Sequence, residues 1–371
     1  MYMITKSTLS KLIEMNIPVL LTGHPGVGKT YTIHQIGQEL GYTVITVITS
    51  LHDPTDFGGM PVISDDGVRF VPPRWAVEMA TDGPTILFFD EIDKAAPAVQ
   101  AAALRIVQER VVGDIALGDQ VRIVAASNPP QYGGWSLIGP LVNRFCLINW
   151  APTPTECADG LMEASLAREC EPRVKEQIGK IAPIVGAFIR HTGLNFAPDR
   201  ETAMSGEQFA TPRGLEQAVY WLAVEAASGE AANLEQRNLA LIGFVGQGVG
   251  LQLAGYLSEM ELPDPEELIA SPDGAIDIPK RLDKIGALVN SLAIAVELNP
   301  TAKRYEAAVH VIGRIADDCG EQDVAIPALM RLMEISRKKK YNIPKEMEKY
   351  ASLLRGAKIL KDAGGTGGDN A

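Results

Sequence analysis

Near its N-terminus the chain carries a short glycine-rich segment typical of phosphate-binding loops. Residues 23–30 match the pattern G-x-x-x-x-G-K-[ST] and stand between an apolar run and a helix-forming run. Such a loop wraps so that its backbone N–H groups face phosphate oxygens. Lys29 is expected to reach the β- and γ-phosphates of a nucleotide, and the Thr30 hydroxyl to hold Mg²⁺. The predicted nucleotide-binding residues of this loop are Gly23, His24, Pro25, Gly26, Val27, Gly28, Lys29 and Thr30. His24 stands at a variable position, and we expect it to face solvent without a catalytic role.

A second group of residues that could take part in catalysis follows the apolar run 86–89. These residues are the carboxylates Asp90 and Glu91. A buried strand of this kind delivers its acids to the carboxyl edge of a parallel sheet, where α/β proteins bind ligands. Asp90 is predicted to hold Mg²⁺ through water, and Glu91 to orient and polarise the water that attacks a phosphate. Because a small-molecule kinase needs no water-activating carboxylate, Glu91 favours a hydrolase.

These residues need a sheet that positions them, and the first third of the chain has the pattern of one. Four short β-rich runs, separated by helix-forming runs, predict strands at Pro18–Thr22, Thr43–Thr49, Thr85–Asp90 and Val121–Ser127. Three of the four are almost wholly apolar, which is typical of parallel strands buried on both faces. The predicted fold class is α/β: a P-loop NTPase parallel sheet core with helices on both faces, followed by an all-α lid and a C-terminal helical region.

The composition changes after Trp150, where the run Ala-Pro-Thr-Pro-Thr interrupts the alternation of strands and helices. We therefore predict a nucleotide-binding domain at residues 1–150 and a helical lid at 151–255. A Pro- and acid-rich stretch, 256–279, then opens a C-terminal helical region at 256–363. The Gly-rich tail at 364–371 is predicted to be disordered.

Overall composition narrows the function classes. The chain has 371 residues, 46% of them hydrophobic, and a net charge of −12 from 34 basic and 46 acidic residues. An acidic chain repels phosphate backbones, so general coating of nucleic acid or of an anionic membrane is disfavoured. The four cysteines form no C-x-x-C pair, which favours reduced thiols over a zinc site or a disulfide framework. No long apolar stretch or secretory leader is recognisable, so we expect a cytoplasmic protein.

Four motifs together resemble those of AAA+ ATPases: the loop at 23–30, FFDEIDKA at 88–95, SNPP at 127–130 and LVNRF at 141–145. The run 128–145 is similar to the MoxR or dynein-related branch of the helix-2-insert clade. The resemblance covers residues 1–150 and, with fewer matching positions, 151–255. It implies an enzyme that hydrolyses ATP with Mg²⁺ and assembles with copies of itself into a ring, with a hexamer as the expected form.

The resemblance also assigns roles to three further residues. Asn128 matches the polar sensor, whose amide would hydrogen-bond the attacking water or the γ-phosphate. Arg144 matches the arginine finger, which acts in trans on a neighbouring subunit's ATP and suits developing phosphoryl charge because it is permanently ionised. Asn143 stands where many relatives carry Asp. Arg213 resembles the second sensor, an arginine at the start of a lid helix that would reach the γ-phosphate. The residue types alone are also compatible with other roles: Asn128 could only form a turn, and Arg144 and Arg213 could be ordinary surface residues.

Two insertions interrupt the predicted sheet order. Residues 51–80 hold a predicted β-hairpin with its turn at Asp65-Asp66-Gly67, and a second hairpin is predicted at about 109–120. The resemblance implies that the first is the helix-2 insert, pointing toward the central pore of the ring. Candidates for contact with a client protein are Gly58, Gly59, Met60, Phe70 and Trp75. The alternative is that Phe70 and Trp75 only pack the base of the insert.

The segment 335–361 carries nine basic and two acidic residues. It fits a solvated helix face, a contact with the acidic stretch 256–279, or a nucleic-acid contact. The last supports the alternative function, an AAA+ motor or loader acting on nucleic acid. The predicted function is a MoxR-type AAA+ ATPase that remodels or matures a partner protein. Relatives of this branch often act with von Willebrand factor A-domain proteins, so we expect a client of that kind. We expect no binding to nucleic acid or to a membrane.

Overall fold

The computed structural model describes residues 5–65, 67–81, 83–198, 200–229, 233–350 and 353–354. The chain divides into two compact units, Met1–Ala151 with Asp199–Ser205, and Pro152–Pro198 with Gly206–Ala371. The tail 364–371, predicted to be disordered, and the end of the basic segment 335–361 lie outside the described residues. Within the described ranges, no helix combines the length and apolar content needed to span a bilayer.

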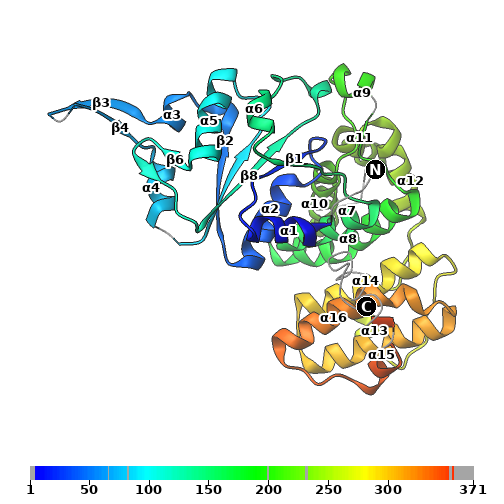
Figure 1. The fold of residues 1–371 in the computed structure, drawn as a ribbon. Coiled ribbons are helices and arrows are strands. Elements are labelled where there is room, and N and C mark those ends of the chain that lie inside the picture. The colour runs from blue at the N-terminus through cyan, green and yellow to red at the C-terminus, as the bar shows by residue number, and fades with distance from the viewer. Residues whose placement is uncertain are drawn as a thin grey trace, which may run out of the picture. The chain divides into compact units, whose positions relative to one another are not determined.

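The first unit is built on a five-stranded sheet in which all neighbours are parallel (Figure 1). The strand order is β2-β5-β8-β1-β9. The strands are β1 (Val19–Thr22), β2 (Thr43–Ile48), β5 (Thr85–Asp90), β8 (Val121–Ser127) and β9 (Cys146–Asn149). Four of them are the predicted strands. Strand β9 was not predicted, because this four-residue edge strand exposes alternate residues and has no continuous apolar run.

Helices lie on both faces of this sheet, as the fold class predicted (Figure 1). Successive side chains of a strand point to opposite faces, so an apolar run implies burial on both. In β5, Leu87 and Phe89 belong to the core cluster under α5. Ile86 instead faces α2, where a Cβ on Gly37 would lie 3.7 Å from its Cδ1. The α-helices of the unit are α1 (Lys6–Glu14), α2 (Lys29–Leu40), α3 (Thr55–Gly58), α4 (Arg74–Thr81), α5 (Pro97–Glu109), α6 (Gly139–Val142) and α9 (Arg200–Ser205), with the 3-10 helices η1 (Thr49–Leu51) and η2 (Pro130–Tyr132).

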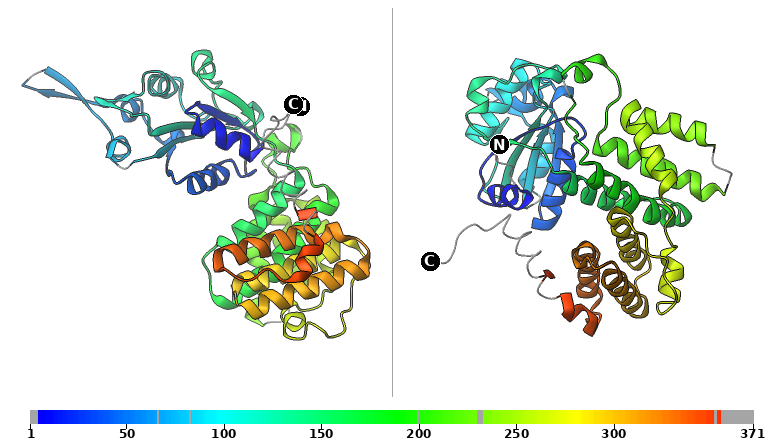
Figure 2. Two further views of the ribbon diagram at one scale, coloured as in Figure 1. Left: turned by 60° about the horizontal axis from the view of Figure 1, so that its bottom comes forward. Right: turned by 90° about the vertical axis from the view of Figure 1, so that its right-hand side faces the viewer.

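Both predicted insertions contain β-hairpins. Strands β3 (Met60–Ser64) and β4 (Gly67–Val71) pair antiparallel and extend away from the sheet (Figure 2). The middle residue of the predicted turn, at position 66, lies outside the described residues. The second hairpin joins β6 (Val111–Val112) to β7 (Ile115–Ala116). The two hairpins are tied together, because the Phe70 N–H donates to Asp114 Oδ2 at 3.1 Å and the Asp114 N–H donates to the Phe70 carbonyl at 3.0 Å.

The two aromatic residues of the first insertion have different surroundings. Trp75 is partly buried and packs on the core cluster, with its ring 6.1 Å from that of the buried Phe57. Phe70 remains 43% exposed on β4. Trp75 therefore packs the base of the insert, whereas Phe70 remains accessible for contact with a client protein.

The regular elements described in the second unit are helices. Its first helix begins with a capping box, in which Thr153 and Glu156 each bond the backbone N–H of the other. The α-helices are α7 (Pro154–Ala167), α8 (Pro172–Thr192), α10 (Pro212–Ser228), α11 (Leu234–Val245), α12 (Gln247–Glu259), α13 (Pro265–Ala270), α14 (Leu282–Leu298), α15 (Ala302–Cys319) and α16 (Ile326–Lys339), with the 3-10 helices η3 (Gln322–Ala325) and η4 (Lys345–Tyr350).

Helix α14 packs against both α8 and α16. The approach to α8 is close at Gly179, where a Cβ would lie 2.9 Å from Leu298 Cδ1 and 3.2 Å from Ile294 Cγ2. This contact joins helices from the predicted lid (151–255) and the predicted C-terminal region (256–363) in one compact unit. The boundary between those two regions stays a prediction.

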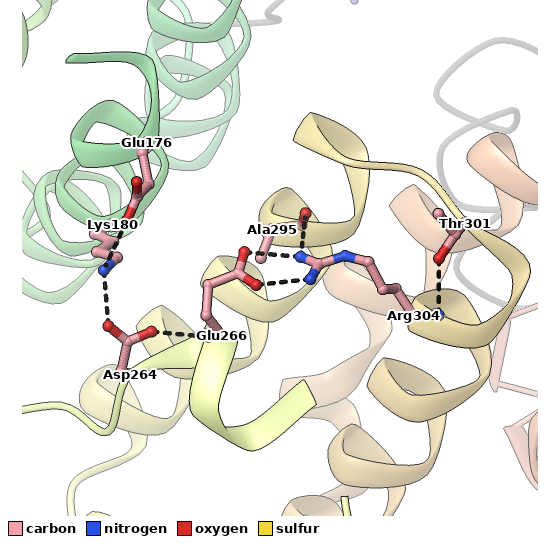
Figure 3. A network of polar contacts seen from close by, with 7 residues as sticks. All are labelled: Glu176, Lys180, Asp264, Glu266, Ala295, Thr301 and Arg304. Atoms are coloured by element: carbon pink, nitrogen blue, oxygen red, sulfur yellow. Dashed lines mark hydrogen bonds and ion pairs between the residues drawn. The ribbon is translucent and has the colours of Figure 1, made fainter. Parts of the chain in front are cut away.

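Polar contacts also tie α8 to α13 and α15 (Figure 3). Lys180 Nζ lies 2.7 Å from Asp264 Oδ2. Asp264 is the N-cap of α13 and accepts the N–H of Glu266 at 2.8 Å. Both carboxylate oxygens of Glu266 accept hydrogen bonds from Arg304 at 2.7 Å, and Arg304 also donates to the Ala295 carbonyl. One connected network thus links four helices of the second unit, α8, α13, α14 and α15.

Asp264→Ala is expected to lower the free energy of unfolding by ~1–2 kcal/mol, because the change removes a helix cap and the partner of Lys180. Burial alone would raise the pKa of Asp264, but the hydrogen bonds from Lys180 and from the Glu266 N–H lower it below its usual value. A carboxyl with a depressed folded pKa stabilises the fold above its unfolded pKa and loses this effect as pH falls through the folded value. The difference between wild type and variant should therefore shrink as pH falls below 3.8.

Equilibrium urea unfolding at pH 7 and at pH 3 measures this difference. Asp277→Ala removes an exposed carboxylate from the neighbouring segment and serves as the control. Equal losses for the two variants, or a loss that does not depend on pH, would show that the cap and ion pair do not carry the stabilisation.

Candidate active site

The glycine-rich loop leads from the end of β1 into α2, and its glycines meet two different requirements. Gly26 and Gly28 have φ angles of 75° and 85°, in the left-handed region that glycine adopts without strain, and Gly28 is the N-cap of α2. Gly23 is needed for space, because a Cβ there would lie 2.4 Å from the carbonyl oxygen of Trp150. The loop therefore depends on glycine at three of its eight positions.

Lys29 is the first residue of α2 and is only 8% exposed. Its Nζ donates to the carbonyls of Gly23 at 2.6 Å and His24 at 3.0 Å, and to Asn128 Oδ1 at 2.9 Å. Because β1 and β8 are parallel neighbours, their carboxyl ends bring the loop and Asn128 together. All three acceptors are oxygens, which phosphate oxygens could replace around the same ammonium group.

Thr30 and Asp90 form the second contact of the site. The Thr30 hydroxyl donates to Asp90 Oδ2 at 2.8 Å, and the buried Thr49 hydroxyl donates to the Asp90 carbonyl at 2.9 Å. Mg²⁺ prefers oxygen ligands and is commonly held by one or two protein groups together with substrate phosphates. The hydroxyl and carboxylate side by side fit such an ion.

Glu91 follows directly and has a φ angle of 54°, which is uncommon outside glycine and frequent at functional sites. Its side chain is exposed, and Oε2 accepts a hydrogen bond from the Ser50 hydroxyl at 3.0 Å. The sequence analysis missed Ser50. It follows β2, whose last residue Ile48 pairs in register with Asp90, so only the strand order reveals its position.

Asn128 is held by a residue that the sequence analysis also missed. Its backbone N–H donates to Asp93 Oδ1 at 3.0 Å. Asp93 is 5% exposed, and its Oδ2 has no hydrogen-bond partner within the described structure. Burial raises the pKa of Asp93, against the hydrogen bond from Asn128 and the nearby charges of Lys94 and Lys29.

The expectation that His24 faces solvent is wrong. The side chain is partly buried, and its Nδ1 lies 2.6 Å from the Tyr132 hydroxyl. Burial, and then the charge of Lys29, lower the pKa of His24 below its ordinary value of 6.5. The imidazole is therefore neutral at pH 7. The variable position of the motif is occupied here by a residue with a specific partner.

The two arginines of the prediction lie on other elements of the chain. Arg144 is exposed after α6, and its guanidinium donates to Gln108 Oε1 at 3.3 Å. Within the part of the chain that the structure describes, it makes no hydrogen bond or ion pair with the loop 23–30, Asp90 or Glu91. Arg213 lies in the second unit, on the first turn of α10, behind the N-cap Thr211. Their roles stay predictions.

Comparisons with known proteins point to one family for the first unit. Residues 19–149 match the family model described as "ATPase family associated with various cellular activities (AAA)". Human "ATPase family gene 2 protein homolog B" is 38% identical over 117 residues, which are 30% of this chain and 15% of that protein. "Protein MoxR" of Methylorubrum extorquens is 36% identical over 95 residues, 25% of this chain and 27% of that protein. This chain thus spans only a small part of the relatives that it matches.

Among solved structures, the Thermotoga maritima RuvB Holliday junction branch migration motor is similar, with 17% identity. The match covers 92% of this chain and 96% of that one, with a TM-score of 0.33.

Proposed function

Because residues 19–149 are an AAA ATPase domain, we propose that this chain hydrolyses ATP in an oligomeric ring and uses the energy to remodel or mature a partner protein. The match to Protein MoxR fits a MoxR-branch AAA+ ATPase. The observation that carries the proposal is the gathering of Lys29, Asp90, Glu91 and Asn128 at one edge of the sheet. A protein that only binds nucleotide would have no use for Glu91.

The proposed chemistry follows from these positions. The β- and γ-phosphates of ATP take the place of the carbonyl oxygens around Lys29, whose charge then offsets theirs. Thr30 and Asp90 would hold Mg²⁺, which would offset the charge that develops on the phosphates. Glu91 accepts a hydrogen bond from the attacking water and polarises it. The Asn128 side chain, fixed through its backbone by Asp93, holds the water or the γ-phosphate.

Ser50 holds the Glu91 side chain in place. In the structure its hydroxyl occupies Oε2 of Glu91, so that the carboxylate is held toward β2. This hydrogen bond leaves the other carboxylate oxygen, Oε1, for the attacking water. Ser50 therefore orients Glu91 without blocking its proposed role as the base.

A ring is proposed because Arg144 is exposed and lies apart from the site residues of its own chain. An arginine that belongs to the active site but cannot be supplied by the same chain has to come from a neighbour. Head-to-tail contacts form a ring when the rotation between subunits closes, and a hexamer is the form we propose. Arg213 is proposed as the second sensor from its place on the first turn of α10.

Contact with a client is proposed for the hairpin β3–β4. Directly paired residues share a face, so the pairs Pro61–Phe70 and Ile63–Val68 make one face wholly apolar. Ile63 is 88% exposed, and Phe70 and Val68 are exposed as well. Exposed apolar surface of this kind is typical of interaction sites. A von Willebrand factor A-domain protein is the proposed client, and a cytoplasmic location stays a prediction.

The nucleic-acid alternative gains little from the structure. The exposed run 337–340 lies at the C-terminal end of α16, where cations favour the helix dipole. A solvated helix end accounts for these charges without a polyanionic partner.

The ring is tested by measuring ATP turnover per chain as a function of protein concentration, with the assembly mass measured in the same samples. The expected result is a specific activity that rises steeply as the ring forms. A rate per chain that stays constant down to a demonstrated monomer would instead show a self-contained P-loop enzyme.

A further inference from the structure

The contact between His24 and Tyr132 joins two segments that are distant in the sequence. Tyr132 closes the 3-10 helix η2, which begins directly after Asn128-Pro129. Its hydroxyl lies 2.6 Å from His24 Nδ1, and the two rings meet edge to face, with centroids 5.5 Å apart and planes at 89°. Burial raises the pKa of Tyr132, so its hydroxyl keeps its proton and can donate to the neutral imidazole.

The backbone around Tyr132 is held by hydrogen bonds to Lys94 and Asp93. Lys94 Nζ donates to the carbonyls of Tyr132 at 2.6 Å and of Gly133 at 2.7 Å. The Trp135 N–H donates to the Asp93 carbonyl at 2.7 Å. Lys94 and Asp93 lie in the turn directly after β5, so the position of Tyr132 is set by the segment that follows the strand with Asp90.

The His24 end of the contact bears directly on the phosphate-binding loop. The carbonyl of His24 accepts from Lys29, while its side chain is tied to Tyr132. One residue thus connects the loop backbone, the lysine that the motif requires and the segment after Asn128. A loop already held in its binding conformation binds phosphate without paying to become ordered.

We propose that Tyr132 and His24 are positioning residues that hold the phosphate-binding loop ready for nucleotide, so that affinity for ATP and ADP depends on the segment that follows Asn128. The proposal rests on nucleotide binding at this loop, which the proposed function includes. Neither side chain takes part in the chemical step.

The test combines Tyr132→Phe, which keeps the ring and removes the hydroxyl, with His24→Ala and the double variant. Binding of ADP and of ATP is measured by calorimetry, and turnover is measured at saturating ATP. Loss of one hydrogen bond is expected to raise Kd and KM by about 3- to 10-fold, with kcat within about 2-fold of wild type because the chemical groups remain. The double variant should bind about as weakly as the weaker single variant, because both changes remove the same contact.

Tyr42→Phe is the matched control, since its ring faces the guanidinium of Arg122 and it is not part of the site. His24→Ala carries the same test if Tyr132→Phe fails to fold. Wild-type affinity in both single variants, additive losses in the double variant, or a lower kcat with unchanged KM would overturn the proposal. If the wild type binds nucleotide but does not hydrolyse it, the proposed ATPase activity is contradicted. The binding measurements then still decide the role of Tyr132. Absence of binding by the wild type would overturn both.

Discussion

Glu91→Gln is expected to reduce ATP turnover by ~10²–10⁴-fold, the range typical of a lost general base. The amide keeps the size and hydrogen-bonding oxygen of the carboxylate, but it cannot take a proton from water. The contact with the Ser50 hydroxyl can persist, because the amide oxygen still accepts. The groups placed to hold phosphate, Lys29 and Thr30, are unchanged, so Kd for ATP should stay within about 2-fold of wild type.

Turnover at saturating ATP and calorimetric binding of ATP to the same preparation measure the two effects separately. Glu39→Gln is the matched control, because it removes an exposed carboxylate that pairs with Lys6 near the far end of α2. Turnover within 10-fold of wild type in Glu91→Gln would show that another group activates the water. A parallel loss of ATP binding would mean that Glu91 holds the nucleotide rather than the water.

Arg144→Ala is expected to reduce turnover by ~10³-fold or more, as removal of an arginine finger does, while ATP still binds. The decisive form of the experiment mixes this variant with Glu91→Gln. Each variant is inactive alone for a different reason, since one lacks the finger and the other lacks the base. If the finger acts in trans, the Glu91→Gln subunit supplies Arg144 to a neighbour that retains Glu91. A random equal mixture in a head-to-tail ring should then restore activity at about a quarter of the interfaces.

Arg105→Ala, which removes an exposed arginine paired with Glu109 on α5, is the control for loss of surface charge. Full activity of Arg144→Ala alone would exclude the finger role. Two inactive variants that stay inactive after mixing, in rings shown to contain both, would place Arg144 in the active site of its own chain.

Local sequence determined much of this protein. The glycines at positions 23, 26 and 28 predict the loop because close approach and left-handed φ angles are properties of the chain within a few residues. The apolar run 86–89 predicts a strand with two-sided burial, and its terminal acids predict which edge of the sheet carries chemistry.

Only the tertiary structure decided which side chains meet at that edge. Ser50 reaches Glu91 because β2 lies beside β5, and Asp93 reaches the backbone of Asn128 because β5 lies beside β8. His24 and Tyr132 stand 108 positions apart, and nothing in either neighbourhood indicates the pairing. Strand order depends on long-range packing, which the local pattern of each strand does not encode. The sequence therefore determined where the nucleotide chemistry would be, and the fold decided which neighbours hold its groups in place.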